Sequence, residues 1–167
     1  PGDPAKAEAI LERLAGVLSY SITSSARPRV SLGEELAAVR DYLEIEQARF
    51  GARLRSRIDV DAALEDDGVP PMLVQPLVEN AVLHGVSSSE EGATVTLEGR
   101  VDRDAMVLTV SDDGPGPGGS TRRGNGTGLA NLRERLAIVY GDAARLSIGP
   151  RAGGGFACEI RVPRTAS

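Results

Sequence analysis

The stretch QPLVENAVLHG, residues 75–85, contains the first residues whose types could do chemistry. Asn80 and His84 are four positions apart, so they would lie on the same face of a helix. His84 is the only histidine in the chain. The stretch alone leaves four roles open for this imidazole: a catalytic group, a phosphate ligand, a phosphoacceptor, or a structural residue that ends a helix before Gly85.

A second candidate segment is the glycine-rich run DDGPGPGGSTRRGNGTG, residues 112–128. Glycine lets backbone N–H groups approach phosphate oxygens, and the N-terminus of a following helix adds positive potential. The run follows a predicted strand and ends where a helix is predicted to begin, which favours a binding loop over a linker. Arg122 and Arg123 could contact phosphates or could be solvated loop charges. The P-loop pattern GxxxxGK[ST] is absent, and the βαβ context of a dinucleotide fingerprint is missing.

Composition limits the classes of protein that remain. The 167 residues suffice for one domain with an appended segment. A net charge of −5 argues against a nucleic-acid partner. One cysteine, Cys158, excludes an internal disulfide and a cysteine-based metal site, and we interpret it as a small strand residue. No apolar run approaches the ~20 residues of a membrane span. Because the chain begins with Pro1 rather than Met, we expect it to be part of a longer protein that could hold a membrane segment.

The N-terminal half is predicted to begin with two helices. Residues 4–24 have helical periodicity with a seam close to a heptad, which favours either packing on their own domain or half of a dimerising hairpin. The apolar positions of that seam are Ala7, Ile10, Leu11, Leu14, Val17, Leu18 and Ile22. Ser31 and Glu34 form a predicted capping box, which starts a second helix that ends near Phe50, with Gly51 as the stop.

The rest of the chain alternates between strands and helices. Pro70 and Pro71 are predicted to open a third helix that runs to about His84. A fourth helix is predicted at residues 129–140, and strands at 54–60, 94–101, 105–111, 145–148 and 156–162. Short links between strands imply hairpins. The predicted fold is therefore an α/β two-layer sandwich, with a mixed, mostly antiparallel sheet of about five strands, about three helices on one face, and an additional N-terminal helix.

Three blocks stand in order along the chain: QPLVENAVLHG, DDGPG and GNGTGLANLRERL. Together they resemble the ATP-binding catalytic domain of sensor histidine kinases, in the superfamily shared with gyrase, mismatch-repair and chaperone ATPases. The stretches VSLGEELAAVRDYLEIEQARFG, VPPMLVQPLVENAVLHG and ANLRERLAIVYG resemble the LytS-like branch of these kinases. The resemblance covers nearly the whole chain.

The resemblance implies a set of residues that bind ATP and Mg²⁺. Asn80 would coordinate the Mg²⁺ that bridges the phosphates. Asp112 would accept a hydrogen bond from the adenine amino group, which selects against guanine. Gly114 and Gly116 would let the chain turn beside the base. The other expected nucleotide-binding residues lie near the end of the glycine-rich run: Arg123, Gly126, Thr127, Gly128 and Leu129.

The roles of three neighbours of Asn80 also follow from the resemblance. Glu79 would order a metal-bound water or act as a base, although a surface charge would look the same. His84 would face the phosphates, and Gln75 is a further candidate for the metal shell. In hydrolysing relatives the water-activating acid lies four residues before the asparagine, where this chain has Pro76. This difference predicts phosphoryl transfer to an acceptor supplied from elsewhere rather than free hydrolysis.

The resemblance finally implies domains and partners. Residues 1–26 would be the C-terminal part of a dimerisation hairpin, and residues 27–167 the ATP-binding domain. The phosphorylated histidine of this branch lies in a block resembling PHFLFN, which does not occur here, so the chain alone is not expected to autophosphorylate. Expected partners are ATP, a response regulator and, in the longer protein, a second copy, on the cytosolic side of a membrane-anchored bacterial sensor. The alternatives are a serine kinase of the anti-sigma type, an ATPase module, and a degenerate nucleotide sensor or scaffold.

Overall fold

The main sheet of the protein has five strands in a computed structural model that describes residues 4–115, 127–151 and 154–165. Its spatial order is β2 (Leu54–Val60), β4 (Ala93–Asp102), β5 (Ala105–Asp112), β7 (Phe156–Pro163) and β6 (Arg145–Pro150). The β2–β4 pair is parallel, and the other three pairs are antiparallel. The predicted mixed, mostly antiparallel sheet is therefore confirmed.

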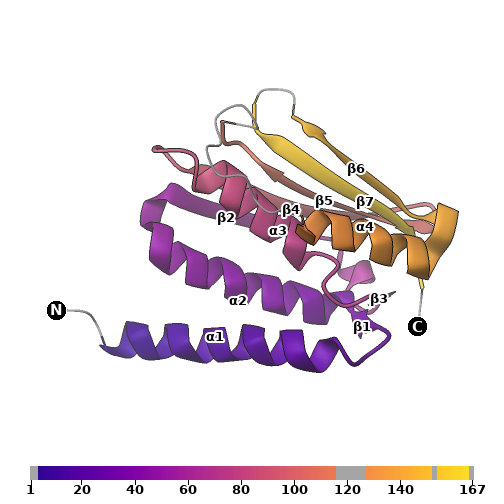
Figure 1. Cartoon of the computed structure of the whole chain (residues 1–167), viewed down its shortest axis with the longest axis horizontal. Coiled ribbons are helices and arrows are strands. Elements are labelled where there is room, and N and C mark those ends of the chain that lie inside the picture. The colour runs from indigo at the N-terminus through magenta and orange to yellow at the C-terminus, as the bar shows by residue number, and fades with distance from the viewer. Residues whose placement is uncertain (1–3, 116–126, 152–153, 166–167) are drawn as a thin grey trace.

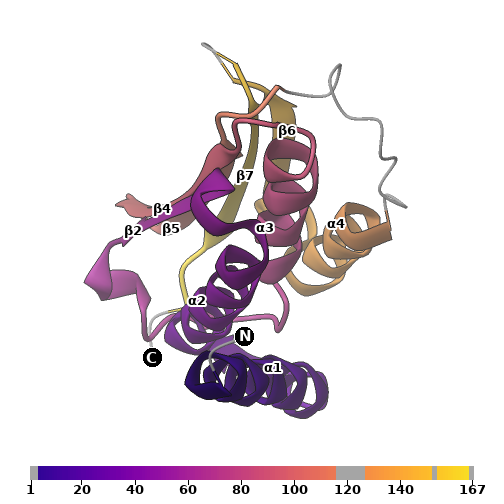
Figure 2. The ribbon, with the colours of Figure 1, turned by 90° about the vertical axis from the view of Figure 1, so that its left-hand side faces the viewer.

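Helices cover one face of this sheet (Figures 1 and 2). They are α2 (Leu32–Phe50), α3 (Gln75–Ala81) with its continuation η3 (Val82–Val86), and α4 (Thr127–Tyr140). The fourth helix, α1 (Pro4–Ser24), lies along α2 and away from the sheet (Figure 2). Aliphatic side chains from the sheet and from α2, α3 and α4 form one core between the two layers. The two-layer sandwich with an N-terminal helix is the predicted architecture.

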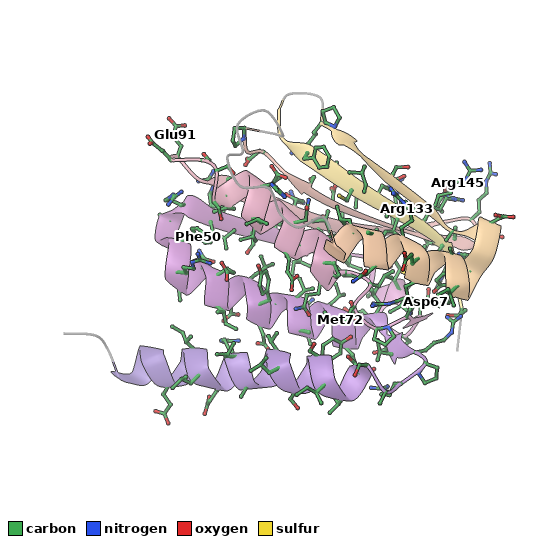
Figure 3. All side chains as sticks on the ribbon, viewed as in Figure 1. Phe50, Asp67, Met72, Glu91, Arg133 and Arg145 are labelled. Atoms are coloured by element: carbon green, nitrogen blue, oxygen red, sulfur yellow. The ribbon has the colours of Figure 1, made fainter. Side chains whose placement is uncertain are left out.

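Several short elements connect these layers. A small antiparallel sheet pairs β1 (Val30–Ser31) with β3 (Gly68–Val69). Single helical turns follow α2, β2 and α4, at η1 (Gly51–Arg53), η2 (Ala62–Leu64) and η4 (Gly141–Ala143). The buried Asp67, labelled in Figure 3, accepts a hydrogen bond of 2.7 Å from Arg164, which ties the small sheet to the end of β7.

The predicted capping box forms at the start of α2. The Ser31 side chain accepts from the Glu34 N–H at 3.2 Å, and the Glu34 carboxylate accepts from the Ser31 N–H at 2.9 Å. At the other end of the helix, Gly51 has φ = 60°, a left-handed conformation that glycine adopts without steric strain. Both predicted boundaries of α2 are confirmed.

The predicted start of the third helix is wrong. Pro70 and Pro71 do not open α3, which begins at Gln75. Met72 has φ = 59°, a left-handed conformation that a helix cannot contain. The proline that does lie in the first turn is Pro76, where the missing N–H has no helical partner to lose.

Helix α1 is attached to α2 by polar contacts and carries exposed apolar side chains. Arg13 pairs with Asp41 at 2.8 Å and with Glu44 at 2.6 Å. Leu18 is 55% exposed and Ile22 is 72% exposed. Within the described ranges, no helix has the length and apolar character needed to cross a membrane.

Cys158 lies on β7, inside the hydrophobic core. It is 3% exposed on β7, in register with Val110 of β5 and Ile148 of β6. Burial raises the pKa of its thiol to about 11, and the charge of Asp112 adds to this effect. The prediction of a small strand residue agrees with this position.

Candidate functional site

Asp112 is a buried carboxylate at the C-terminal end of β5. Its exposed fraction is 3%, and its Oδ1 accepts a hydrogen bond from the Gly114 N–H at 3.0 Å. Burial raises the pKa of Asp112, and the bond from Gly114 opposes that effect. A partly desolvated acid at the end of a strand is a common signature of a functional site.

Glycines enclose this carboxylate at contact distance. A Cβ atom added to Gly85 would lie 2.7 Å from the Asp112 side chain, and one added to Gly114 would lie 2.6 Å from the Gly85 backbone. Gly155 approaches from the β6–β7 turn, where an added Cβ would lie 1.9 Å from the Asp112 carbonyl oxygen. Only residues without a side chain fit at these three positions, so the glycines fix the place of the acid.

The helix that carries Asn80 and His84 changes its pitch between them. After Ala81 the α-helix continues as the π-helical turn Val82–Val86, and the Ser87 N–H donates to the Val82 carbonyl at 3.0 Å. Such π-helical turns are rare in proteins, and many of those that occur lie at functional sites. This turn brings the backbone of Gly85 against Asp112.

Asn80 and Glu79 lie on α3 with different environments. Asn80 is half-buried, and its side chain makes no hydrogen bond to any residue in the described part of the chain. Glu79 is exposed, and it accepts a hydrogen bond of 2.9 Å from the Gln75 side-chain amide. Gln75 itself is buried, and its Oε1 atom finds no donor among the described residues. Gln75 therefore orients Glu79, a role that sequence reasoning missed.

Charged residues around Asp112 come from several elements. Burial has the largest effect on the pKa of Asp112 and raises it, whereas electrostatic interactions with His84 and Arg151 lower it. Arg151 belongs to the β6–β7 turn, and nothing in the sequence pointed to it. Asp113 has a structural function, because its Oδ1 accepts from the Thr94 N–H at 2.5 Å and holds the chain against β4.

The first turn of α4 lies beside the first turn of α3. A Cβ added to Gly128 would be 3.8 Å from the Cβ of Pro76, an ordinary van der Waals distance. Leu129 packs against the core, and Thr127 is the first residue of the helix. The predicted residues Gly116, Arg123 and Gly126 lie outside the described residues.

The structure thus brings together part of the predicted site. Asp112 and Gly114 lie together at the end of β5 with Gly85 and Gly155, two glycines that the sequence did not single out as site residues, and His84 is near enough to Asp112 to affect its pKa. Asn80 and Glu79 lie on the same helix as His84, toward its start. The beginning of α4 is beside that helix.

Family models match most of the chain. Residues 70–166 match the family described as histidine kinase-, DNA gyrase B- and HSP90-like ATPase, and residues 2–54 match the family described as histidine kinase. The first match alone extends over more than half of the chain, so the chain belongs to this ATPase family.

Curated relatives point to one branch of the sensor kinases. The chain is 29% identical over 172 residues to sensor protein LytS of Enterococcus faecalis, covering 96% of this chain and 29% of that protein. It is 30% identical over 137 residues to sensor histidine kinase YesM of Bacillus subtilis, covering 80% of this chain and 24% of that protein. The resemblance to LytS-like sensor histidine kinases is confirmed, and the chain spans about a quarter of the length of these relatives.

A solved structure shares the fold. The histidine kinase domain of the blue-light activated histidine kinase EL346 from Erythrobacter litoralis superposes with a TM-score of 0.59 at 22% identity. The superposition covers 98% of this chain and 76% of that domain. At this identity the comparison supports the fold.

Proposed function

We propose that this chain is the ATP-binding catalytic part of a two-component sensor histidine kinase, which transfers the γ-phosphoryl group of ATP to a histidine outside these residues. The observation that carries the proposal is the buried Asp112 carboxylate between Gly85 and Gly114, inside the segment that matches the ATPase family. The match of residues 2–54 to the histidine kinase model favours this class over an anti-sigma serine kinase or a free ATPase module.

The adenine base would bind at Asp112. The bond from Gly114 uses Oδ1, which leaves Oδ2 to accept a hydrogen bond from the adenine amino group. Guanine presents an acceptor at the same position and would face the carboxylate with a repulsive contact. Because Asp112 is buried, this difference would be worth more than at a water-exposed site.

The phosphates and Mg²⁺ would lie between α3 and the start of α4. When bound, Mg²⁺ neutralises phosphate charge and orients the transferred group. The Asn80 amide oxygen is not engaged by any described residue and suits a hard cation. No group of three acidic, histidine or cysteine side chains in the described ranges could hold a metal without the nucleotide, which fits a metal bound mainly through phosphates.

The remaining proposed contacts follow the resemblance. His84 would face the phosphates, and the N–H groups at Thr127, Gly128 and Leu129 would approach them at the N-terminus of α4. Gly116 would border the base, and Arg123 and Gly126 would complete the phosphate side. Glu79, oriented by Gln75, is the candidate to order a water in the metal shell.

Phosphoryl transfer is favoured over hydrolysis by Pro76. Its position corresponds to the water-activating acid of hydrolysing relatives, and its side chain carries no group that could take a proton. Catalysis would then rest on positioning and charge stabilisation, with the acceptor brought from outside.

The partners proposed for the longer protein follow from the same assignment. Residues 1–26 would be the second helix of a dimerisation hairpin, and residues 27–167 the catalytic domain. The exposed apolar side chains of α1 suit a helical partner from a second copy. A response regulator would receive the phosphoryl group on the cytosolic side of the membrane, and any membrane anchor would belong to other segments.

The test is a calorimetric titration with a non-hydrolysable ATP analogue and Mg²⁺, repeated with the corresponding GTP analogue. The wild type is expected to bind the ATP analogue selectively, and Asp112→Asn to lose roughly 100-fold in affinity, the size expected for a buried charged hydrogen bond. Asp104→Asn, in the exposed β4–β5 turn, is the matched control and should bind like the wild type. Unchanged affinity in Asp112→Asn would contradict the proposed function.

A further inference from the structure

Glu35 is a buried carboxylate that the proposed catalytic chemistry does not use. It lies on α2 with an exposed fraction of 1%. Its Oε1 accepts from the Met72 N–H at 2.5 Å, and its Oε2 accepts from the Val74 N–H at 2.9 Å. A buried carboxylate is stable only when such donors replace its water. Here both backbone donors come from the segment immediately before α3.

The same segment is also held from the opposite side. Arg135 of α4 donates to the Met72 carbonyl at 3.2 Å and to the Pro71 carbonyl. Met72 (labelled in Figure 3) therefore has its N–H bound to α2 and its carbonyl bound to α4. Its left-handed conformation, φ = 59°, is unfavourable for a residue with a side chain and persists because these bonds determine it.

A third donor links Glu35 to α1. The Tyr20 hydroxyl donates to Oε1, the same oxygen that binds the Met72 N–H. Burial and the bond to Glu35 raise the pKa of Tyr20, so the phenol keeps its proton and remains a donor. The Glu35 side chain therefore connects Tyr20 of α1 directly to the segment that precedes α3.

We propose that Glu35 is a positioning residue for α3 and that its bond to Tyr20 couples the position of α1 to nucleotide affinity. Gln75, Glu79 and Asn80 all follow the segment that Glu35 fixes. A displacement of α1 removes the Tyr20 hydroxyl from Oε1, loosens the Glu35 side chain and leaves α3 less ordered for binding. Coupling of this kind is reciprocal, so nucleotide binding in turn strengthens the contact between α1 and Glu35.

This inference rests on the proposed nucleotide site, and the experiment separates the two. Affinity for the ATP analogue with Mg²⁺ is measured well below the unfolding temperature for Tyr20→Phe and Glu35→Gln. Glutamine offers one acceptor oxygen where two backbone N–H groups bind different oxygens, so one of them loses its partner. We expect about a tenfold loss of affinity for Glu35→Gln and about a threefold loss for Tyr20→Phe.

Two matched variants control for general effects on the fold. Tyr140→Phe deletes a hydroxyl at the end of α4 and leaves the Glu35 bonds untouched. Glu34→Gln neutralises the adjacent, partly exposed carboxylate on the same helix. Both are expected to stay within twofold of the wild-type affinity. An equal loss in Glu34→Gln and Glu35→Gln overturns the positioning role, because it assigns the effect to helix stability.

A spectroscopic readout tests the coupling directly. The chain has three tyrosines and no tryptophan, so fluorotyrosine labelling gives few ¹⁹F signals, and Tyr20→Phe assigns one of them. We expect the Tyr20 signal to shift when the nucleotide analogue is added. No binding by the wild type refutes the proposed function itself. Binding with a stationary Tyr20 signal, or with wild-type affinity in Tyr20→Phe, overturns the coupling while the proposed function stands.

Discussion

At the scale of single residues, the buried charge of Asp112 is expected to lower the stability of the fold and to favour nucleotide binding. Because burial raises its pKa above the ordinary value of 3.8, the ionised carboxylate opposes folding at neutral pH. That penalty disappears as the pH falls below the unfolded value, where the acid is protonated in both states. A residue kept at such a penalty is expected to serve binding rather than the fold.

The first prediction concerns the destabilising effect of the ionised Asp112 carboxylate. Without nucleotide at pH 7, Asp112→Asn should be more stable than the wild type by about 1 kcal/mol, since it keeps the Oδ1 acceptor and removes the buried charge. The advantage should shrink as the pH is lowered through the folded pKa toward 3.8 and below. Thermal unfolding with and without the ATP analogue measures both effects. A variant that melts lower than the wild type, or gains as much from nucleotide, would contradict this account.

The second prediction concerns the glycine contact. Gly85→Ala places a methyl group 2.7 Å from the Asp112 side chain, so the acid or the π-helical turn must move. We expect a loss of about 1–3 kcal/mol in stability and at least about a tenfold loss of nucleotide affinity. Gly149→Ala on β6 is the matched control, because an added Cβ there meets nothing within 4 Å. Its stability should change by less than about 0.5 kcal/mol. Wild-type affinity in Gly85→Ala would show that this contact does not place Asp112.

The sequence indicates which residues of the candidate site could do chemistry, but not which residues surround them. Asp112 and Asn80 could be predicted because each belongs to a local block with a recognisable pattern. Arg151, Gly155 and the Gln75–Glu79 bond could not. The first two come from a distant turn that only the pairing of β5 with β7 brings to Asp112, and the bond depends on side-chain orientation.

At the scale of elements, α2 is the helix whose ends the sequence defines most clearly. The capping box and the glycine stop are local signals, and both are confirmed. For α3 the sequence predicts too early a start, because a Pro-Pro pair is compatible with a helical first turn. The contacts that prevent it, from Glu35 and Arg135, are 37 and 63 residues away in sequence from Met72. Long-range contacts of this kind leave no periodic pattern.

The third prediction concerns the pH dependence of the α2 cap. Arg27, followed by the Ser31 backbone N–H, lowers the pKa of Glu34 from 4.5 to about 2. A lowered pKa means that the ionised carboxylate stabilises the fold above pH 4.5 and that this contribution disappears as the pH falls to about 2. Glu34→Gln should therefore be less stable by roughly 0.5 kcal/mol at pH 7, a small value because solvent screens this exposed pair. Acid unfolding curves should converge near pH 2. A constant difference at all pH values would rule out the charge as its cause.

At the scale of the whole molecule, α1 is packed separately from the sheet and its covering helices. The sheet and its three covering helices share one core, whereas α1 touches that body through α2 (Figure 2). Leu18 and Ile22 on the outer side of α1 stay exposed. An element attached in this way can change its position while the sheet keeps its pairing, and the bond from Tyr20 to Glu35 would carry that change to α3.

The fourth prediction is that these residues alone do not become phosphorylated. Their single histidine, His84, lies in the π-helical turn next to Asp112, where it cannot travel to a bound γ-phosphate as an external acceptor does. Incubation with radiolabelled ATP and Mg²⁺ should leave no acid-labile phosphate on the chain, under conditions where the ATP analogue binds. Acid-labile phosphate located on His84 itself by mass spectrometry of the digested chain would instead identify His84 as the acceptor and contradict a phosphoacceptor outside these residues.

The fifth prediction follows from the burial of Cys158. A thiol that is 3% exposed, with a pKa of about 11, reacts with an alkylating reagent only when the sheet around β7 opens. The labelling rate of the native chain therefore reports how often the core opens, and the ATP analogue should slow labelling in proportion to site occupancy. A labelling rate that saturating analogue leaves unchanged would mean that β7 opens without releasing the ligand. The single natural cysteine therefore reports how often the core of the unmodified chain opens. Because Cys158 is buried, a cysteine introduced at exposed Ser147 would be labelled selectively with a dye or attached to a surface.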